Sequence, residues 1–292
     1  MLPVALSDSI GRILLRKYGK PVQIKSLTPL GGGCINQSYR IDTNSDSFFI
    51  KYNRAETFKG MFSSEAAGLK QLLDAGSIRI PSVIENGETD EYTFLMLEFI
   101  HQGRKGNGFW EGFGSALANL HKQSDEVFGW GMDNYIGSLP QSNKAHKAWI
   151  DFFIMERLEP MLKLARDGKK IGPELARRFD TLYNRFNEIF PPEPPALLHG
   201  DLWSGNFLVD ETGNPCLIDP AVYYGHREAD LAMTHLFGGF SEEFYSAYHS
   251  VFPLEKGWEK RIDIFNLYPL LVHVNLFGGG YISDVGRIMA YY

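Results

Sequence analysis

The stretch Leu197-Leu198-His199-Gly200-Asp201-Leu202-Trp203-Ser204-Gly205-Asn206, followed by Cys216-Leu217-Ile218-Asp219, decides how this chain is expected to fold. Between its two parts, residues 207–210 read as a strand, 211–214 as a turn and 215–218 as the returning strand. The sequence therefore predicts a short β-hairpin with polar residues gathered at its open end.

Three polar side chains are expected to converge at that end. If the turn centres on Thr212-Gly213, antiparallel pairing brings Asn206 and Asp219 together, and Asp201 lies just outside them. ATP-dependent phosphoryl transfer uses such a set, with one Asp to take the acceptor's proton and an Asn and an Asp to hold Mg²⁺. Asp and Asn also populate ordinary turns, but the spacing and the flanking apolar strands favour the catalytic interpretation.

The bulk composition is that of an ordinary globular chain. It has 292 residues, 44% hydrophobic and 22% charged, a length that suggests about two domains or lobes. The net charge of −6 and the absence of a clustered basic run argue against binding to nucleic acid or an anionic membrane.

The expected location is cytoplasmic. The first twenty residues alternate apolar with charged positions, which is unlike a signal peptide, and no stretch long enough to span a membrane is free of charges. Two cysteines, Cys34 and Cys216, are too few for a disulfide scaffold and indicate a reducing compartment.

A glycine-rich loop lies between two strand-like runs near the N-terminus. Residues 22–27 and 37–41 have strand character, and Gly31-Gly32-Gly33-Cys34 separates them. Glycines let a backbone approach a bound group closely, so Gly32 and Gly33 are candidates for covering a phosphate. A hairpin that simply needs glycines is an equally good interpretation of this loop taken alone.

A lysine and a glutamate are predicted to form a buried ion pair. Lys51 lies in the apolar strand 48–52, where protein kinases keep the lysine that pairs with the ATP phosphates. In the helix that follows, Glu65 shares a face with Leu69 and Leu72. A glutamate on a buried face needs a cationic partner, and Lys51 is the obvious one.

The chain is predicted to divide at residue 100. Residues 80–83 and 92–100 supply two more strands, and the polar, glycine-rich segment 101–108 then joins two lobes. In a kinase hinge the backbone of Leu97, Glu98 and Phe99 would line the adenine slot, although an ordinary strand and loop would look the same.

The expected fold class is α+β, with two lobes arranged as in protein kinases. The N-terminal lobe, 1–100, would bind ATP with an antiparallel β-sheet and one key helix. The larger and mainly helical lobe, 101–292, would carry the catalytic loop and the acceptor site. Within it, His121 ends a helix and is expected to cap or pack, and Asp230 is expected either to cap a helix or to brace the catalytic loop.

The central motifs resemble the fructosamine kinase (ketosamine-3-kinase) family, which shares a superfamily with aminoglycoside phosphotransferases and choline kinases. The resemblance is carried by 197–206 and by 219–233, where Trp203-Ser204 and Asp219-Pro220-Ala221 look particular to fructosamine kinases. It covers nearly the whole chain and includes further segments: Gly31 to Asn36, Asp133 to Gly137 with Gln141 and Asn143, and Leu276 to Gly280.

This resemblance implies a two-lobed protein-kinase-like fold and ATP-dependent phosphorylation of the sugar 3-hydroxyl of ketosamines, either small molecules or glycated proteins. The product would be unstable and shed its sugar, which deglycates the amine. The implied site residues are a base, Asp201; two Mg²⁺ ligands, Asn206 and Asp219; nucleotide contacts, Lys51, Glu65, Gly32, Gly33, Leu97, Glu98 and Phe99; and sugar contacts, Trp203, His226 and Phe277.

Three further possibilities stay open on the sequence. Cys34 could link a redox-sensitive homodimer, as proposed for some family members, or could be a small buried hydrophobe in a monomer. The same fold could phosphorylate another hydroxyl, as in aminoglycoside or choline kinases. The chain could also be an inactive kinase-like binding protein, although every catalytic position holds the right residue type.

Overall fold

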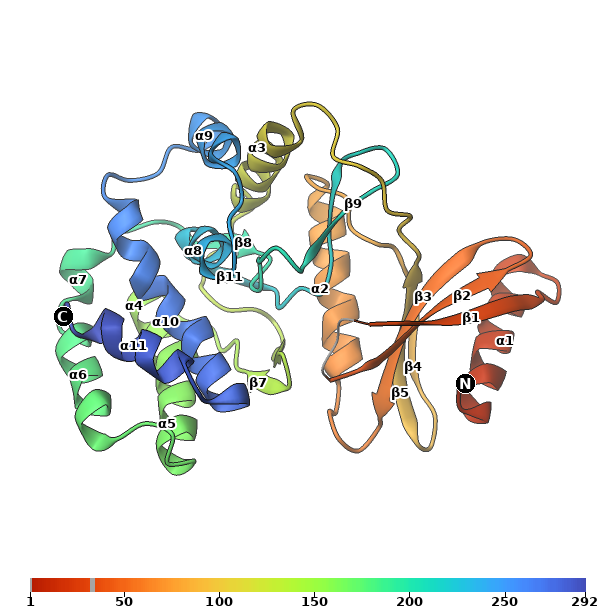
Figure 1. Cartoon of the computed structure of the whole chain (residues 1–292), viewed down its shortest axis with the longest axis horizontal. Helices are drawn as coiled ribbons and strands as arrows, with labels where there is room; N and C mark the ends of the chain where they lie inside the picture. Colours follow the sequence, from red (N-terminus) through yellow and green to blue (C-terminus); the bar gives the residue numbers. More distant parts are fainter. Residues whose placement is uncertain (1, 32–34) are drawn as a thin grey trace.

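A five-stranded antiparallel sheet forms the N-terminal part of the computed structural model, which describes residues 2–31 and 35–292 (Figure 1). The strand order is β1-β2-β3-β5-β4. The bounds are β1 Ile24–Leu30, β2 Gln37–Thr43, β3 Ser47–Arg54, β4 Val83–Glu88 and β5 Tyr92–Glu98. The strand predicted at 80–83 was placed too early, because Pro81 has no N–H to donate and β4 begins only at Val83.

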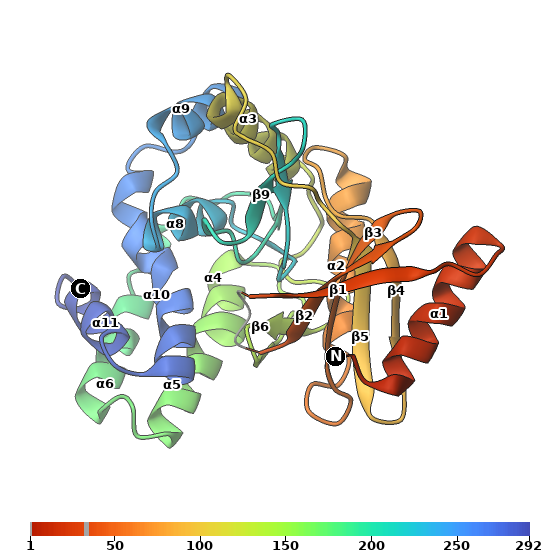
Figure 2. The ribbon, with the colours of Figure 1, turned by 45° about the vertical axis from the view of Figure 1, so that its right-hand side comes forward.

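Two helices cover the two faces of this sheet (Figure 2). Helix α1, Val4–Tyr18, buries Leu6, Ile10 and Leu14 against the outer face, and it ends at Gly19 in the left-handed conformation. Helix α2, Met61–Ala75, lies on the face toward the rest of the chain. It is the predicted key helix, and it carries Glu65.

The C-terminal part is mainly helical, as predicted, so the α+β class is confirmed. Its helices are α3 Phe109–His121, α4 Trp149–Phe152, the π-helical turn η1 Phe153–Leu158, α5 Glu159–Asp167, α6 Pro173–Tyr183, α7 Phe186–Ile189, α8 Glu228–Leu236, α9 Glu242–Val251, α10 Trp258–Phe277 and α11 Tyr281–Met289. Three small two-stranded antiparallel sheets complete it: β6 Asn134–Ile136 with β7 Leu139–Gln141, β8 Ala196–Leu198 with β11 Tyr223–Gly225, and β9 Phe207–Val209 with β10 Pro215–Leu217.

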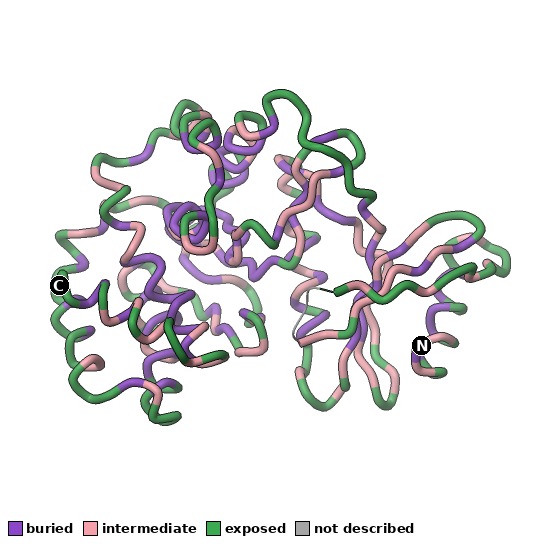
Figure 3. Tube along the Cα trace, in the orientation of Figure 1, coloured by how far each residue is buried: buried purple, intermediate pink, exposed green. Residues whose placement is uncertain are grey.

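The largest buried cluster, rich in aromatic side chains, lies among α4–α7, α10 and α11. A second cluster joins α2 and β5 to α3, α8 and α9, so it crosses the boundary predicted at residue 100. Figure 3 shows buried positions running through the centre of both parts, while the hairpin tips of the sheet are exposed. Within residues 2–31 and 35–292, no helix combines the length and the apolar character that crossing a bilayer needs.

Candidate active site

The predicted β9–β10 hairpin is present and has the expected register. Val209 pairs with Pro215 and Phe207 with Leu217. The next contact toward the open end is the amide of Ile218, which donates to the carbonyl of Asn206 over 3.0 Å. Asn206 and Asp219 therefore leave the open end of the hairpin side by side.

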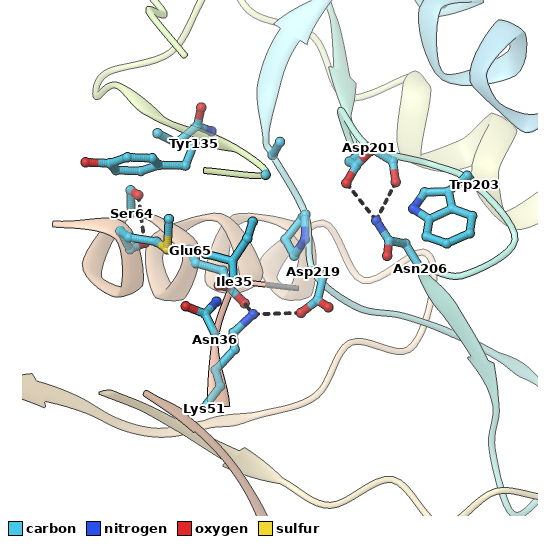
Figure 4. Close-up of a pocket in the computed structure, with 15 residues that line it drawn as sticks. Ile35, Asn36, Lys51, Ser64, Glu65, Tyr135, Asp201, Trp203, Asn206 and Asp219 are labelled. Atoms are coloured by element: carbon cyan, nitrogen blue, oxygen red, sulfur yellow. Dashed lines mark hydrogen bonds and ion pairs between the residues drawn. The ribbon is translucent and has the colours of Figure 1, made fainter. Parts of the chain in front are cut away.

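The hairpin end lies in a cavity of about 240 Å³ between the N-terminal sheet and the helical part (Figure 4). Both parts contribute to its walls. The lining residues are Ile35, Asn36, Lys51, Met61, Ser64, Glu65, Asn134, Tyr135, Gly137, Asp201, Trp203, Asn206, Asp219, Pro220 and Ala221. All the residues proposed for proton transfer, metal binding and phosphate contact that the structure describes thus share one cavity.

Lys51 is the centre of the ionic contacts in this cavity. Its Nζ lies 2.6 Å from Oε1 of Glu65, which is the predicted ion pair, and 2.7 Å from Oδ1 of Asp219. Burial by itself would lower the pKa of Lys51, but the charges of Asp219 and Glu65 outweigh it and raise the pKa above its ordinary value. Conversely, the charge of Lys51 and the hydrogen bond that it donates hold the pKa of Asp219 below its usual range. The lysine is therefore charged and aimed at the cavity.

Asn206 is joined to Asp201. Its Nδ2 donates to the backbone carbonyl of Asp201 over 2.8 Å and to the carboxylate Oδ2 over 2.9 Å. Burial raises the pKa of Asp201 to about 7, and the nearby charges of Asp219 and Asp230 add to this effect. A carboxylate with a pKa near neutrality is suited to accepting a proton from a hydroxyl group.

The loop before Asp201 is held from behind by Asp230. The carboxylate of Asp230 accepts hydrogen bonds from the amides of His199 (2.7 Å) and Gly200 (2.9 Å). Of the two roles considered for Asp230, the structure thus shows bracing of the catalytic loop. His121, expected only to cap or pack, is buried and places Nε2 3.2 Å from the same carboxylate. Sequence reasoning missed this contact because 109 residues separate the two.

His199 connects the loop to the hairpin. Its Nε2 lies 3.0 Å from the carbonyl of Ile218, and its Nδ1 accepts a hydrogen bond from the amide of Asp201. These partners require a neutral imidazole protonated on Nε2. Burial lowers the pKa of His199, which agrees with a neutral ring. The residue therefore connects Asp201, the predicted base, to the backbone just before Asp219, a predicted metal ligand.

The predicted sugar contacts are distributed unevenly. Trp203 lines the cavity and packs edge-on against Phe237, with ring centroids 5.8 Å apart. His226 is fully buried between Trp149 and Phe265, and Phe277 is 59% exposed at the end of α10. Neither His226 nor Phe277 is among the described residues that line the cavity. The prediction that His226 contacts the sugar is not supported, because no part of its side chain reaches the cavity.

Charged partners surround His226 instead. Glu193 pairs with Arg227 over 2.7 Å, and Glu228 pairs with Arg261 over 2.5 Å. Glu193, His226 and Glu228 lie close enough together to resemble a cation site. Because both carboxylates already pair with arginines, the group is a buried ionic cluster rather than an open cation site.

Of the predicted adenine hinge, Leu97 and Glu98 lie in β5, and Phe99 directly follows that strand. The amide of Glu98 donates to the carbonyl of Ser82 over 3.0 Å, and the amide of Phe99 donates to Ser47 over 3.3 Å. Leu97 pairs with strands on both sides. These contacts leave the two amides engaged within the protein. The remaining predicted nucleotide contacts, Gly32 and Gly33, and the proposed redox residue Cys34 lie outside the described residues.

Comparison with known proteins agrees with this geometry. A model of the fructosamine kinase family matches residues 6–292. A probable ketoamine kinase of Enterococcus faecium is 42% identical, covering 89% of this chain and 93% of the relative. The chloroplastic protein-ribulosamine 3-kinase of Arabidopsis thaliana is 40% identical, covering 98% of this chain and 88% of the relative.

Solved structures give the same result at the level of the fold. A candidate fructosamine-3-kinase from Thermobifida fusca superimposes with a TM-score of 0.86 and 33% identity, covering 98% of this chain and 99% of the other. An aminoglycoside phosphotransferase has a TM-score of 0.63 at 14% identity, covering 97% and 96% of the two chains, which shows a shared fold only. The chain belongs to the fructosamine kinase family.

Proposed function

We propose that the protein transfers the γ-phosphate of ATP to the 3-hydroxyl of ketosamines of the fructosamine or ribulosamine type. The observation that carries this proposal is that Lys51, Asp201 and Asp219 face one cavity, with Asn206 joined to the candidate base. The protein-ribulosamine 3-kinase among its relatives supports the choice of acceptor.

Asp201 is the proposed base. Its carboxylate borders the cavity, and its raised pKa favours proton uptake near neutral pH. Lys51, held in place by Glu65, would contact the phosphates of the nucleotide. We place nucleotide binding mainly in residues 1–100 and acceptor binding mainly in residues 101–292. Trp203 offers an aromatic face to the sugar.

The donor atoms of Asn206 and Asp219 suit Mg²⁺. Asn206 uses Nδ2 in its bonds to Asp201, which leaves its amide oxygen for a cation. The Asp219 side chain is 50% exposed toward the cavity, and its Lys51 contact is made by Oδ1. Hard oxygen donors of this type are those that Mg²⁺ prefers. A bound Mg²⁺ would neutralise the charge of the phosphates.

A panel of acceptors tests the proposal. ATP consumption is measured with fructose-lysine, ribulose-lysine, erythrulose-lysine, an aminoglycoside and choline. We expect turnover with at least one ketosamine, ³¹P NMR of the product showing the phosphate on the 3-oxygen, and subsequent release of the sugar. Turnover only with the aminoglycoside or choline would show that the proposed ketosamine acceptor is wrong. No turnover with nucleotide still bound would favour a binding protein.

A further inference from the structure

The β6–β7 hairpin, residues 133–143, has no role in the function described so far. Asn134 pairs with Gln141 across its two short strands. In Figures 1 and 2 the hairpin lies between the C-terminal helices and α2, beside the cavity. Its sequence is one of the segments in which the chain resembles fructosamine kinases, but the sequence alone suggested no task for it.

Two buried amides of the hairpin hold the segment that follows Asp219. Asn134 Nδ2 donates to the carbonyl of Val222 over 2.8 Å. Gln141 Nε2 donates to the carbonyl of Ala221 over 3.2 Å and to Oδ1 of Asn134 over 2.8 Å. Both side chains are buried, so losing these bonds would leave buried carbonyls without donors, at a cost in free energy.

The held segment begins in an uncommon backbone conformation. Asp219 has a φ of +53°, in the left-handed region that non-glycine residues rarely occupy. The amide of Ala221 donates to the carbonyl of His199 over 2.9 Å. A Cβ on Gly200 would come within 2.0 Å of the Ala221 carbonyl oxygen, so the segment packs directly on the loop that carries Asp201. Moving the segment would disturb both carboxylates.

The hairpin also reaches the opposite part of the molecule. Tyr135 donates its hydroxyl to the carbonyl of Lys59 over 3.0 Å, and its ring packs edge-on against Phe58. Both partners precede α2, the helix of Glu65. Farther along α2, a Cβ on Gly68 would lie 3.1 Å from Cγ2 of Val222, so the helix packs closely on the segment that the hairpin holds.

Buried polar side chains of the helical part support the hairpin. Asn143 Nδ2 donates to Oδ1 of Asn134, and Arg157, which is fully buried, donates to Oδ1 of Asn143 over 2.7 Å. Tyr268 of α10 donates to Oε1 of Gln141 over 2.6 Å. In Asn134 and Gln141 both the side-chain oxygen and the side-chain nitrogen are hydrogen-bonded, so these two amides have little freedom to move.

We propose that the 133–143 hairpin is a positioning element, which holds the Asp219 backbone and α2 together so that the Lys51–Glu65–Asp219 group stays assembled. Asn134 and Gln141 are positioning residues that act through Asp219, and Tyr135 acts through α2. The inference rests on the proposed role of Asp219 as a metal ligand. Groups that orient a metal ligand typically change metal affinity by about 10- to 100-fold when they are removed.

Nucleotide binding tests this inference without any acceptor. The dissociation constant of ADP is measured by calorimetry with and without Mg²⁺, for the wild type, Asn134→Ala and Gln141→Leu. We expect the Mg²⁺-dependent gain in affinity to fall about tenfold, with ADP affinity in the absence of Mg²⁺ changed less than about twofold. The matched control is Asn266→Ala, because Asn266 is also a buried amide that donates to a backbone carbonyl over 2.8 Å, that of Ala232. It should keep the full gain.

Tyr135→Ala keeps the test decisive if the buried variants do not fold, because this side chain is only partly buried. In Tyr135→Ala the Mg²⁺-dependent gain in ADP affinity should be about threefold smaller than in the wild type. This is a smaller loss than in Asn134→Ala or Gln141→Leu, whose side chains contact the 221–222 backbone directly. The inference is overturned if every folded hairpin variant keeps the wild-type gain, or if Asn266→Ala loses as much. If Mg²⁺ does not increase the ADP affinity of the wild type, the proposed role of Asp219 as a metal ligand is wrong as well. If Mg²⁺ increases that affinity but no ketosamine is turned over, only the proposed acceptor is wrong.

Discussion

Asp201 is the side chain on which the proposed chemistry depends most directly. Replacing it with Asn keeps its shape but removes the group that accepts the proton, so Asp201→Asn should lower kcat by about 10²-fold or more. The affinity for ADP should change little, since the Lys51 contacts are intact. Steady-state kinetics with a ketosamine checks this. Asp90→Asn, which alters an exposed carboxylate, is the control, and unchanged turnover in Asp201→Asn would refute the assignment.

His226 makes stability depend on pH. Burial lowers its pKa to about 4, compared with about 6.5 in an unfolded chain. Because the unfolded state takes up the proton first, the contribution of His226 is complete above pH 6.5 and is lost as the pH falls toward 4. Between pH 7 and pH 5 the free energy of unfolding should drop by about 2 kcal/mol from this group.

Urea titrations at the two pH values measure that drop. His226→Gln cannot be protonated, so its free energy of unfolding should fall less over the same interval, although the variant starts from a lower value. Glu193, Arg227 and Arg261 face the ring and are present in both proteins, so their contributions are common to the comparison. Equal pH dependence in the two proteins would show that His226 does not titrate in this range.

Local sequence patterns were enough to predict those elements whose contacts are between residues close together in the chain. The β9–β10 hairpin was predictable because its turn residues and strands lie within about a dozen positions, and pairing follows from the turn. The pair β8 and β11 was not, because these three-residue strands are brought together by packing rather than by propensity. His226 was misplaced for a similar reason, since a motif does not reveal which face of a segment is buried.

Arg79 ties β5 to the β9–β10 hairpin. Its guanidinium pairs with Asp210 in the hairpin turn over 2.9 Å and with Glu98 at the end of β5 over 3.1 Å. Arg79→Met leaves the buried Asp210 carboxylate without its cation and should lower the free energy of unfolding by about 1–2 kcal/mol, since Arg79 itself is partly exposed. Chemical denaturation measures this value.

The exposed pair of Arg54 and Glu91 provides the comparison for Arg79. Arg54→Met removes a salt bridge of the same kind from the surface, where such pairs contribute about 0–1 kcal/mol. If Arg79→Met lowers the free energy of unfolding no more than Arg54→Met does, β5 and the β9–β10 hairpin are not coupled through this guanidinium.

For the whole molecule, the two parts share a core. Leu69 of α2 and Leu95 of β5 belong to the same buried cluster as Phe113, Leu197 and Val222 of the helical part. The boundary predicted at residue 100 follows the change from strands to helices along the chain. It does not follow the packing, because a sequence shows where an element ends but not which distant element covers its apolar face.

This shared core predicts that the two parts unfold together. All five tryptophans lie after residue 100, so their fluorescence reports only on the helical part. Leu69→Ala removes a side chain that is 1% exposed on α2 and should lower the free energy of unfolding by about 2–5 kcal/mol. If the core is cooperative, the tryptophan transition must shift by the full amount, although the change lies in the N-terminal part.

Leu73→Ala on the same helix is the control, because Leu73 is 44% exposed and its loss should change stability by less than about 0.5 kcal/mol. Far-ultraviolet circular dichroism, recorded beside the fluorescence, follows the sheet and helices of both parts. Coincident transitions in Leu69→Ala would mean that the cavity is enclosed by one cooperative unit. A dichroism transition that moves while the fluorescence midpoint stays at the wild-type position would instead show that the N-terminal part unfolds on its own.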